Sequence, residues 1–132
     1  LFRSVLNDFG IEPEEFVASA HKVPEKVLAN VEMLNKRTEP TVIITCVGRS
    51  NGLSGVTAGS SVHTVIACPV FSGKDDYLIN IHSTLQMPSD LPVLTVIDTK
   101  NAAYAAVKIL AESDADLRKK VEERIQKIKS KY

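Results

Sequence analysis

The sequence has no excess charge of either sign and few residues of the kinds that form metal sites. Its 16 Lys and Arg balance 16 Asp and Glu, so the net charge is zero. Sequence-independent binding of nucleic acid requires many basic contacts to phosphates, which this balance does not favour. The three His and two Cys residues lack metal-ligand spacing, so we do not expect a metalloenzyme. No apolar stretch approaches the roughly 20 residues of a membrane span, and no signal peptide is visible.

Cysteine is too scarce for the disulfide framework of a small secreted protein. Cys46 and Cys68 each lie inside an apolar, β-branched run, so we expect two buried thiols. Buried free thiols suit a reducing compartment, which predicts a cytoplasmic protein. A chain of 132 residues is large enough to form one domain with a substantial core.

Apolar runs of the lengths typical of strands alternate with helical patterns along the chain. The predicted strands are a short one at 16–18 and three longer ones at 41–47, 64–70 and 93–97. The continuous apolar runs of the three longer strands predict that they are buried on both sides. Helices are predicted at residues 1–9, with Gly10 as C-cap, and at 52–61, 75–85 and 101–112. Another helix begins at Pro24 and has Val27, Leu28, Val31 and Leu34 on one face. A final charged helix carries the apolar stripe Leu117, Val121, Ile125 and Ile128.

This alternation predicts an α/β fold with a parallel sheet. Ligands of such sheets bind at the carboxyl ends of the strands, in the loops that follow them. Three loops therefore become candidates: Ser19–Lys22 (SAHK), Gly48–Gly55 (GRSNGLSG), and the loop after residue 70.

His21 is the leading candidate for chemistry. A neutral imidazole can accept and donate a proton, and this one lies at the expected end of a strand, beside Lys22. A loop histidine that only caps a helix or bonds backbone would give the same local pattern. The pattern around His21 therefore leaves both interpretations open.

The Gly48–Gly55 loop is the second candidate. Its glycines allow backbone N–H groups to approach a small polar or anionic ligand, and a helix begins after it. It lacks the Gly-Lys-Ser/Thr ending of a P-loop and the GxGxxG pattern. The structural alternative is a tight turn between a strand and a helix. His63 and His82 are interpreted as surface or half-buried residues with no role as ligands.

In order along the chain, these motifs resemble the AIR carboxylase and carboxyaminoimidazole ribonucleotide mutase family of purine biosynthesis (AIR is aminoimidazole ribonucleotide). SAHK resembles the family's Ser-Ala-His-Arg/Lys motif, and GRSNGL at 48–53 resembles its second active-site loop in the version of animal-type carboxylases. The mutase branch usually has an Ala-Gly-Gly-Ala-Ala-His run there. Similar family segments match VIACPV at 65–70, LQMPSDLPVLTV at 85–96 and NAAYAAVKIL at 101–110.

The resemblance implies a flavodoxin-like three-layer sandwich, usually an octamer, that needs no metal, biotin or nucleotide cofactor. It implies addition of carbon dioxide to C4 of AIR, with His21 removing the C4 proton. The backbone at 50–52 would hold carbon dioxide, while Lys22 and Arg49 would offset phosphate or carboxylate charge. Gln86-Met87-Pro88 would help to close the pocket. The substrate-binding residues implied in this way are Ser19, Ala20, Lys22, Gly48, Arg49, Ser50, Asn51 and Gly52.

One departure concerns the start of the chain. The family begins with a central strand and a Gly-Ser-x-Ser-Asp-type phosphate loop, and neither is present in residues 1–132. Losing a central strand would cost more than the roughly 5–15 kcal/mol by which a domain is stable. We therefore expect a single AIR carboxylase-like domain that is the retained part of a longer protein, or one that takes this strand from another chain.

Lys22 and GRSNGL favour direct carboxylation over the mutase reaction. The alternatives are the mutase, a related carboxylase acting on another nucleotide-like ring, and a non-catalytic binding domain that kept the fold.

Overall fold

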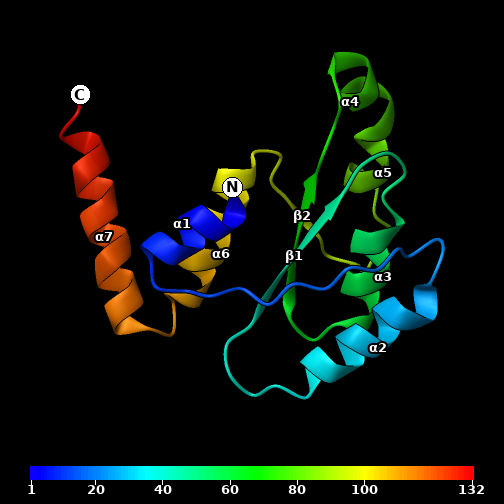
Figure 1. The fold of residues 1–132 in the computed structure, drawn as a ribbon, viewed down its shortest axis with the longest axis horizontal. Coiled ribbons are helices and arrows are strands. Elements are labelled where there is room, and N and C mark those ends of the chain that lie inside the picture. Colours follow the sequence, from blue (N-terminus) through cyan, green and yellow to red (C-terminus); the bar gives the residue numbers. More distant parts are fainter.

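A three-stranded parallel sheet forms the centre of the molecule (Figure 1). The computed structural model describes residues 1–132. The strands are β1 (Val42–Val47), β2 (Thr64–Pro69) and β3 (Leu94–Thr95), in the order β1-β2-β3. The register pairs Ile44 with Ile66 and Ile66 with Leu94. The predicted α/β fold with a parallel sheet is confirmed.

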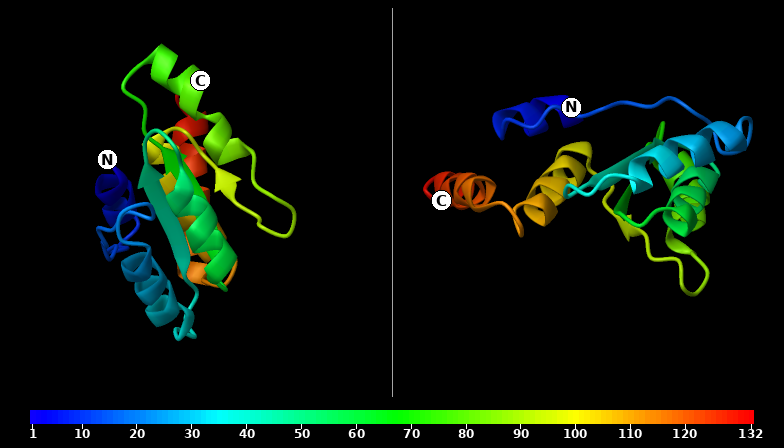
Figure 2. Two further views of the ribbon diagram at one scale, coloured as in Figure 1. Left: turned by 90° about the vertical axis from the view of Figure 1, so that its right-hand side faces the viewer. Right: turned by 90° about the horizontal axis from the view of Figure 1, so that it is seen from below.

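Helices cover both faces of this sheet and complete three layers. On one face, α3 (Gly52–Ser60) packs against the sheet and α2 (Pro24–Asn35) packs against α3. On the other face lies α6 (Thr99–Leu110), and α1 (Phe2–Asp8) and α7 (Ala115–Lys129) pack against α6 (Figures 1 and 2). The remaining helices, α4 (Lys74–Asn80) and α5 (His82–Leu85), follow β2 and replace the single helix expected at 75–85.

The Ala-rich sequence of α6 explains why this helix lies at the centre of the core. Ala102 and Ala106 pack with Ile66 and Cys68 of β2, because their small side chains allow the helix to approach the sheet closely. The other side of α6 contributes to a second cluster with α1 and α7, whose buried members are Leu6, Phe9, Ala103, Val107, Ala111, Leu117 and Val121. α1 and α7 were both predicted from the spacing of their apolar residues. At the end of the α7 stripe, however, Ile128 is exposed.

The helix at the start of the chain is confirmed together with its cap. Gly10 has a φ of +77°, and its N–H donates to Asn7 O at 2.9 Å, while Ile11 N donates to Leu6 O at 3.0 Å. This is the left-handed helix end at which glycine is favoured. α2 also begins at Pro24 as predicted, but Leu28 is 46% exposed and does not share the buried face of Val27, Val31 and Leu34.

The strands differ in burial because of their place in the sheet. Val65 to Pro69 of β2, the central strand, are all buried. β1 bonds only to β2, so its other edge is open, and Thr45 is its one buried residue. The prediction that 41–47 is buried on both sides is therefore wrong. The strand expected at 93–97 is limited to Leu94–Thr95.

No strand forms at residues 16–18, where the sequence predicted one. The segment is extended but joins no ladder, and Val17 is 87% exposed. It runs past β1 without entering the sheet (Figures 1 and 2). The prediction is wrong, because strand propensity alone does not form a strand: the segment makes no backbone hydrogen bonds with the open edge of β1.

Exposed ion pairs connect this extended segment to the helices on either side. Glu15 bonds Arg3 of α1 at 2.7 Å, and Glu14 bonds Arg37 after α2 at 2.8 Å. The hydrogen bond from Arg37 lowers the pKa of Glu14. Exposed ion pairs of this kind contribute little to the free energy of folding, so they affect where the segment lies more than how stable the fold is.

The two thiols differ in accessibility, against the expectation that both are buried. Cys46 and Cys68 are paired in register on β1 and β2, but only Cys68 is buried, because Cys46 lies on the open edge strand. Partial desolvation beside the sheet raises the pKa of the Cys46 thiol, and burial raises the pKa of Cys68 to about 11. Both side chains are thus protonated thiols at neutral pH.

We expect iodoacetamide at pH 7.5 to modify Cys46 first and to leave Cys68 unmodified in the folded protein. Thiolate is the nucleophile, so the raised pKa values slow both reactions and exposure decides their order. Peptide mass spectrometry before and after unfolding in urea measures the two sites, with Cys46→Ser as the control. Faster labelling of Cys68 than of Cys46 would contradict the structure.

Candidate functional site

The two loops singled out in the sequence meet at the carboxyl edge of the sheet. The His21 imidazole lies directly against Gly52, the first residue of α3. A Cβ atom added to Gly52 would lie 2.8 Å from His21 Nε2 and 3.0 Å from Cε1. Only a glycine leaves room for the ring in this position. The structure therefore brings together the SAHK and GRSNGL motifs.

A tight turn before α2 presents His21. Val23 N donates to Ser19 O at 2.9 Å, and Lys22 N lies 3.3 Å from both the Ser19 carbonyl and hydroxyl oxygens. Pro24 then starts α2 with its fixed φ. The turn leaves Ser19 and Ala20 partly buried, and His21 and Lys22 exposed.

The second loop turns sharply between β1 and α3. Arg49 has a φ of +53°, a left-handed conformation that is uncommon for a residue other than glycine. A Cβ on Gly48 would lie 2.7 Å from Val70 O, so this glycine lets the loops after β1 and β2 approach each other. Gly52 N donates to Ser50 O at 3.1 Å, and Arg49 and Ser50 are exposed.

Asn51 is buried and serves as the N-cap of α3. Its Oδ1 accepts from the N–H of Ser54 at 3.0 Å and from the Ser54 hydroxyl at 2.9 Å. Its Nδ2 donates to the Thr84 hydroxyl at 2.9 Å. The Ser54 hydroxyl also lies 2.8 Å from that of Thr45 in β1. The Asn51 side chain thus fixes the loop to α3, α5 and, through Ser54, to the sheet.

We expect Asn51→Ala to reduce the free energy of unfolding by about 2–4 kcal/mol, because it removes a helix cap and leaves buried hydroxyl groups without partners. Urea denaturation followed by circular dichroism measures the loss. Asn101→Ala, at an exposed position in α6, is the matched control and is expected to be nearly neutral. Equal stability of the two variants would show that the buried network contributes nothing.

Two residues that the sequence did not single out also hold the second loop. Ser83 accepts a hydrogen bond from Asn51 N at 2.9 Å, and Thr84 accepts from the Asn51 side chain. Both belong to α5, more than 30 positions away in the sequence, with separations of 32 and 33 residues. The local sequence around these residues does not predict contacts over such separations.

The segment after α5 lies along α3. Met87 Sδ would be 3.5 Å from a Cβ on Gly55, and Leu91 Cδ1 would be 3.2 Å from one on Gly59. Gly52, Gly55 and Gly59 share one face of the helix, so Met87 lies one turn from the glycine that contacts His21. The proposed closing role of Gln86-Met87-Pro88 stays a prediction.

Positive and negative charges lie close together near the second loop. The pKa of Asp76 in α4 is lowered, mainly by hydrogen bonds from the backbone N–H and hydroxyl of Ser72, with Asn80 and the charge of Arg49 adding to the effect. Arg49 therefore lies within electrostatic reach of a carboxylate. Lys22 supplies a second exposed cation beside His21.

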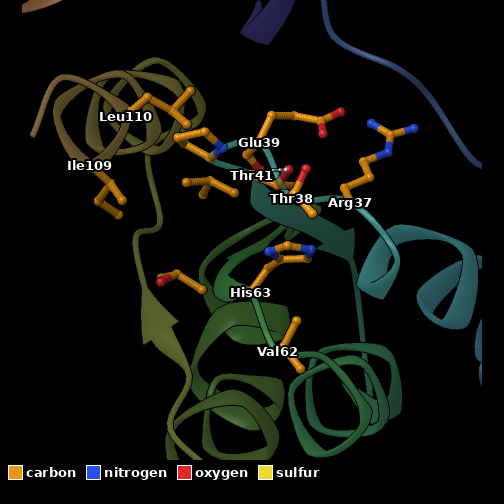
Figure 3. Close-up of a pocket in the computed structure, with 11 residues that line it drawn as sticks. Arg37, Thr38, Glu39, Thr41, Val62, His63, Ile109 and Leu110 are labelled. Atoms are coloured by element: carbon orange, nitrogen blue, oxygen red, sulfur yellow. Dashed lines mark hydrogen bonds between the residues drawn. The ribbon is translucent and has the colours of Figure 1, made fainter. Parts of the chain in front are cut away.

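A separate cavity of about 320 Å³ lies at the opposite edge of the sheet, at the amino ends of β1 and β2 (Figure 3). Its lining includes Arg37, Thr41 and His63. His63 Nε2 bonds Leu34 O at 2.9 Å, and Arg37 is paired with Glu14. These groups hold the structure together, and ligands of parallel sheets bind at the carboxyl edge. We therefore take the loops around His21 as the candidate functional site.

The other histidine behaves as its sequence context suggests, since His82 is exposed on α5. Nowhere in the chain do three His, Cys, Asp or Glu side chains gather in a metal-binding arrangement. None of the helices has the length and apolar character needed to cross a membrane.

The fold and the site define a three-layer α/β protein with an imidazole and a glycine-containing loop at the carboxyl edge of a parallel sheet. A family model described as AIR carboxylase matches residues 2–131. The chain belongs to the AIR carboxylase family.

Relatives with both of the family's names are similar to this chain. A phosphoribosylaminoimidazole carboxylase of Archaeoglobus fulgidus is 42% identical over 89% of this chain and 64% of its own length. An N5-carboxyaminoimidazole ribonucleotide mutase of Methanocaldococcus jannaschii is 42% identical over 97% of this chain and 80% of its own. A crystal structure of Treponema denticola PurE superposes with a TM-score of 0.91 and 34% identity, covering 98% of this chain and 82% of that one. The chain thus spans less than two thirds of the Archaeoglobus carboxylase.

Proposed function

We propose that this chain is the catalytic domain of an AIR carboxylase, which adds carbon dioxide to C4 of aminoimidazole ribonucleotide in purine biosynthesis. The observation that carries the proposal is the contact of the His21 imidazole with Gly52, which unites the family's two motifs in one site. Membership of the AIR carboxylase family supports the substrate class.

The chemistry follows from the electron-rich ring of the substrate. The 5-amino group makes C4 nucleophilic, so C4 attacks the carbon of carbon dioxide, and one C–O π pair becomes the negative charge of the new carboxylate. C4 is then tetrahedral and still carries its hydrogen. His21 removes that proton, the C–H electron pair returns to the ring, and aromaticity is restored. In the reverse direction His21 returns the proton to C4.

The residues around His21 have supporting roles in this proposal. The backbone of Ser50, Asn51 and Gly52 holds carbon dioxide and stabilises the developing carboxylate. Lys22 and Arg49 offset the negative charge of carboxylate or phosphate. Ser19, Ala20 and Gly48 shape the loops against which the nucleotide binds. The site uses no metal or organic cofactor in this scheme.

Lys22 and the GRSNGL loop favour direct carboxylation, whereas the similarity to the Methanocaldococcus mutase supports the mutase reaction as the second candidate. The two are separated by supplying either AIR with bicarbonate or the N5-carboxylated nucleotide, in each case without ATP. We expect the protein to consume AIR. Consumption of the N5-carboxylated compound alone would establish the mutase, and binding without turnover of either would establish a non-catalytic domain.

We also propose that the protein is cytoplasmic and forms a homo-oligomer, which is an octamer by resemblance to the family. Large apolar side chains are exposed on α4, α5 and β3, including Ile79, which is 74% exposed, and Leu78, Leu85 and Leu94. Exposed apolar surface of this kind is typical of subunit contacts. Both cysteines are free, as suits a reducing compartment. Light scattering coupled to size-exclusion chromatography measures the subunit number.

A further inference from the structure

The Ser83 hydroxyl lies at the meeting point of three backbone groups. It accepts a hydrogen bond from Asn51 N at 2.9 Å, and it lies 3.2 Å from Arg49 O and 2.8 Å from Asn80 O. A serine hydroxyl has one proton, so it donates to one of these carbonyls at a time. One side chain of α5 therefore contacts the backbone on both sides of Ser50.

This contact determines which peptide groups of the loop remain free. Asn51 N–H is bonded to Ser83, and Gly52 N–H is bonded to Ser50 O at 3.1 Å. The N–H of Ser50 donates to no group of the protein, and Ser50 is exposed. Of the three backbone donors assigned to carbon dioxide, only that of Ser50 is thus available to a ligand.

We propose that Ser83 is a positioning residue of the reaction, which holds the Arg49–Asn51 backbone in the conformation that leaves the Ser50 N–H free for the carboxylate oxygen. This inference rests on the proposed function. A donor fixed before the reaction stabilises developing charge without having to reorganise. Arg49 needs such support because its left-handed φ of +53° is disfavoured for a side chain of its kind.

Ser83 is a better test of this role than its neighbour Thr84. Thr84 is fully buried and bonds the Asn51 side chain, so its removal disturbs the cap of α3 and the fold. Ser83 is only partly buried and bonds backbone atoms alone. Loss of its hydroxyl therefore loosens the loop while the domain stays folded.

The test compares Ser83→Ala, Ser83→Thr and the control Ser113→Ala, whose hydroxyl bonds Leu110 O at the distant end of α6. We expect S83A to lower kcat by on the order of 10-fold while the affinity for AIR without bicarbonate stays unchanged, because the free donor acts on the carboxylate formed during the reaction. S83T keeps the hydroxyl and recovers most of kcat. S113A behaves as the wild type.

Amide hydrogen exchange without substrate gives the second readout. In S83A, the bonded amides of Asn51 and Gly52 exchange faster than in the wild type, while those of β2 are unchanged. Wild-type kcat in S83A, slow turnover without faster exchange at Asn51 and Gly52, or an S83T variant as slow as S83A would each overturn the inference. If the wild type turns over neither nucleotide, the proposed function fails, while the exchange result still decides whether Ser83 holds the loop.

Discussion

Replacing His21 with Asn is expected to reduce turnover of AIR by about 10²–10⁴-fold, the range supplied by a positioned general acid or base. Asparagine has a similar shape near Cβ but cannot take a proton from C4, so the tetrahedral intermediate returns to substrate. The exposed position of His21 means that folding and melting temperature should change little. Steady-state kinetics with AIR and bicarbonate, together with a titration of AIR alone, separate loss of chemistry from loss of binding.

His82→Asn is the matched control for this experiment. His82 is also exposed but lies on α5, with no contact to Gly52 among the atoms near that glycine. It is expected to keep wild-type turnover. Full activity in the His21 variant would remove His21 from the reaction, and equal losses in both variants would point to a general effect of histidine removal.

Replacing Gly52 with Ala is expected to lower kcat by on the order of 10²-fold, the cost of displacing a catalytic group by about 1 Å. The new Cβ would lie 2.8 Å from His21 Nε2, closer than two such atoms approach, so the imidazole must move. The fold should be retained, since φ at Gly52 is not left-handed and the ring is exposed and able to shift. Activity and urea denaturation, measured on the same preparation, test both statements.

Gly55→Ala provides a control on the same helix face. Its Cβ would lie 3.5 Å from Met87 Sδ, which is ordinary van der Waals contact with a flexible side chain. We expect near wild-type kcat. A loss in Gly55→Ala as large as that in Gly52→Ala would show that the helix, and not the His21 contact, is sensitive to the added methyl group.

The alternation of apolar runs and helical patterns was sufficient to predict the sheet and its flanking helices. The run at 64–70 is continuous because β2 is covered by α3 on one face and α6 on the other. The same kind of pattern failed at 16–18, where Phe16 and Val17 have strand propensity but make no backbone hydrogen bonds with the open edge of β1. It also gave the wrong burial for Cys46, because residue type does not reveal which strand lies at an edge.

The meeting of His21 with the Gly48–Gly52 loop was predicted from the rule that carboxyl ends of parallel strands share one edge. The meeting is observed, but residues 16–18 form no strand, and the turn before α2 places the imidazole instead. Asn51 was predicted as a substrate-binding residue, and its N-cap role had a local signal, since an Asn just before an expected helix is a common N-cap. Ser83 and Met87 had none, because they reach α3 only through the path of the chain after β2. Long-range contacts of this kind depend on tertiary structure.

The most direct test of the account follows the hydrogen on C4 of the substrate. AIR labelled with tritium at C4 is incubated with bicarbonate and either the wild type or the His21→Asn variant, and tritium released to water is counted beside carboxylate formed. If His21 takes the C4 proton, the wild type releases label in step with product and the variant releases almost none. Label release at the same rate from both proteins would contradict it.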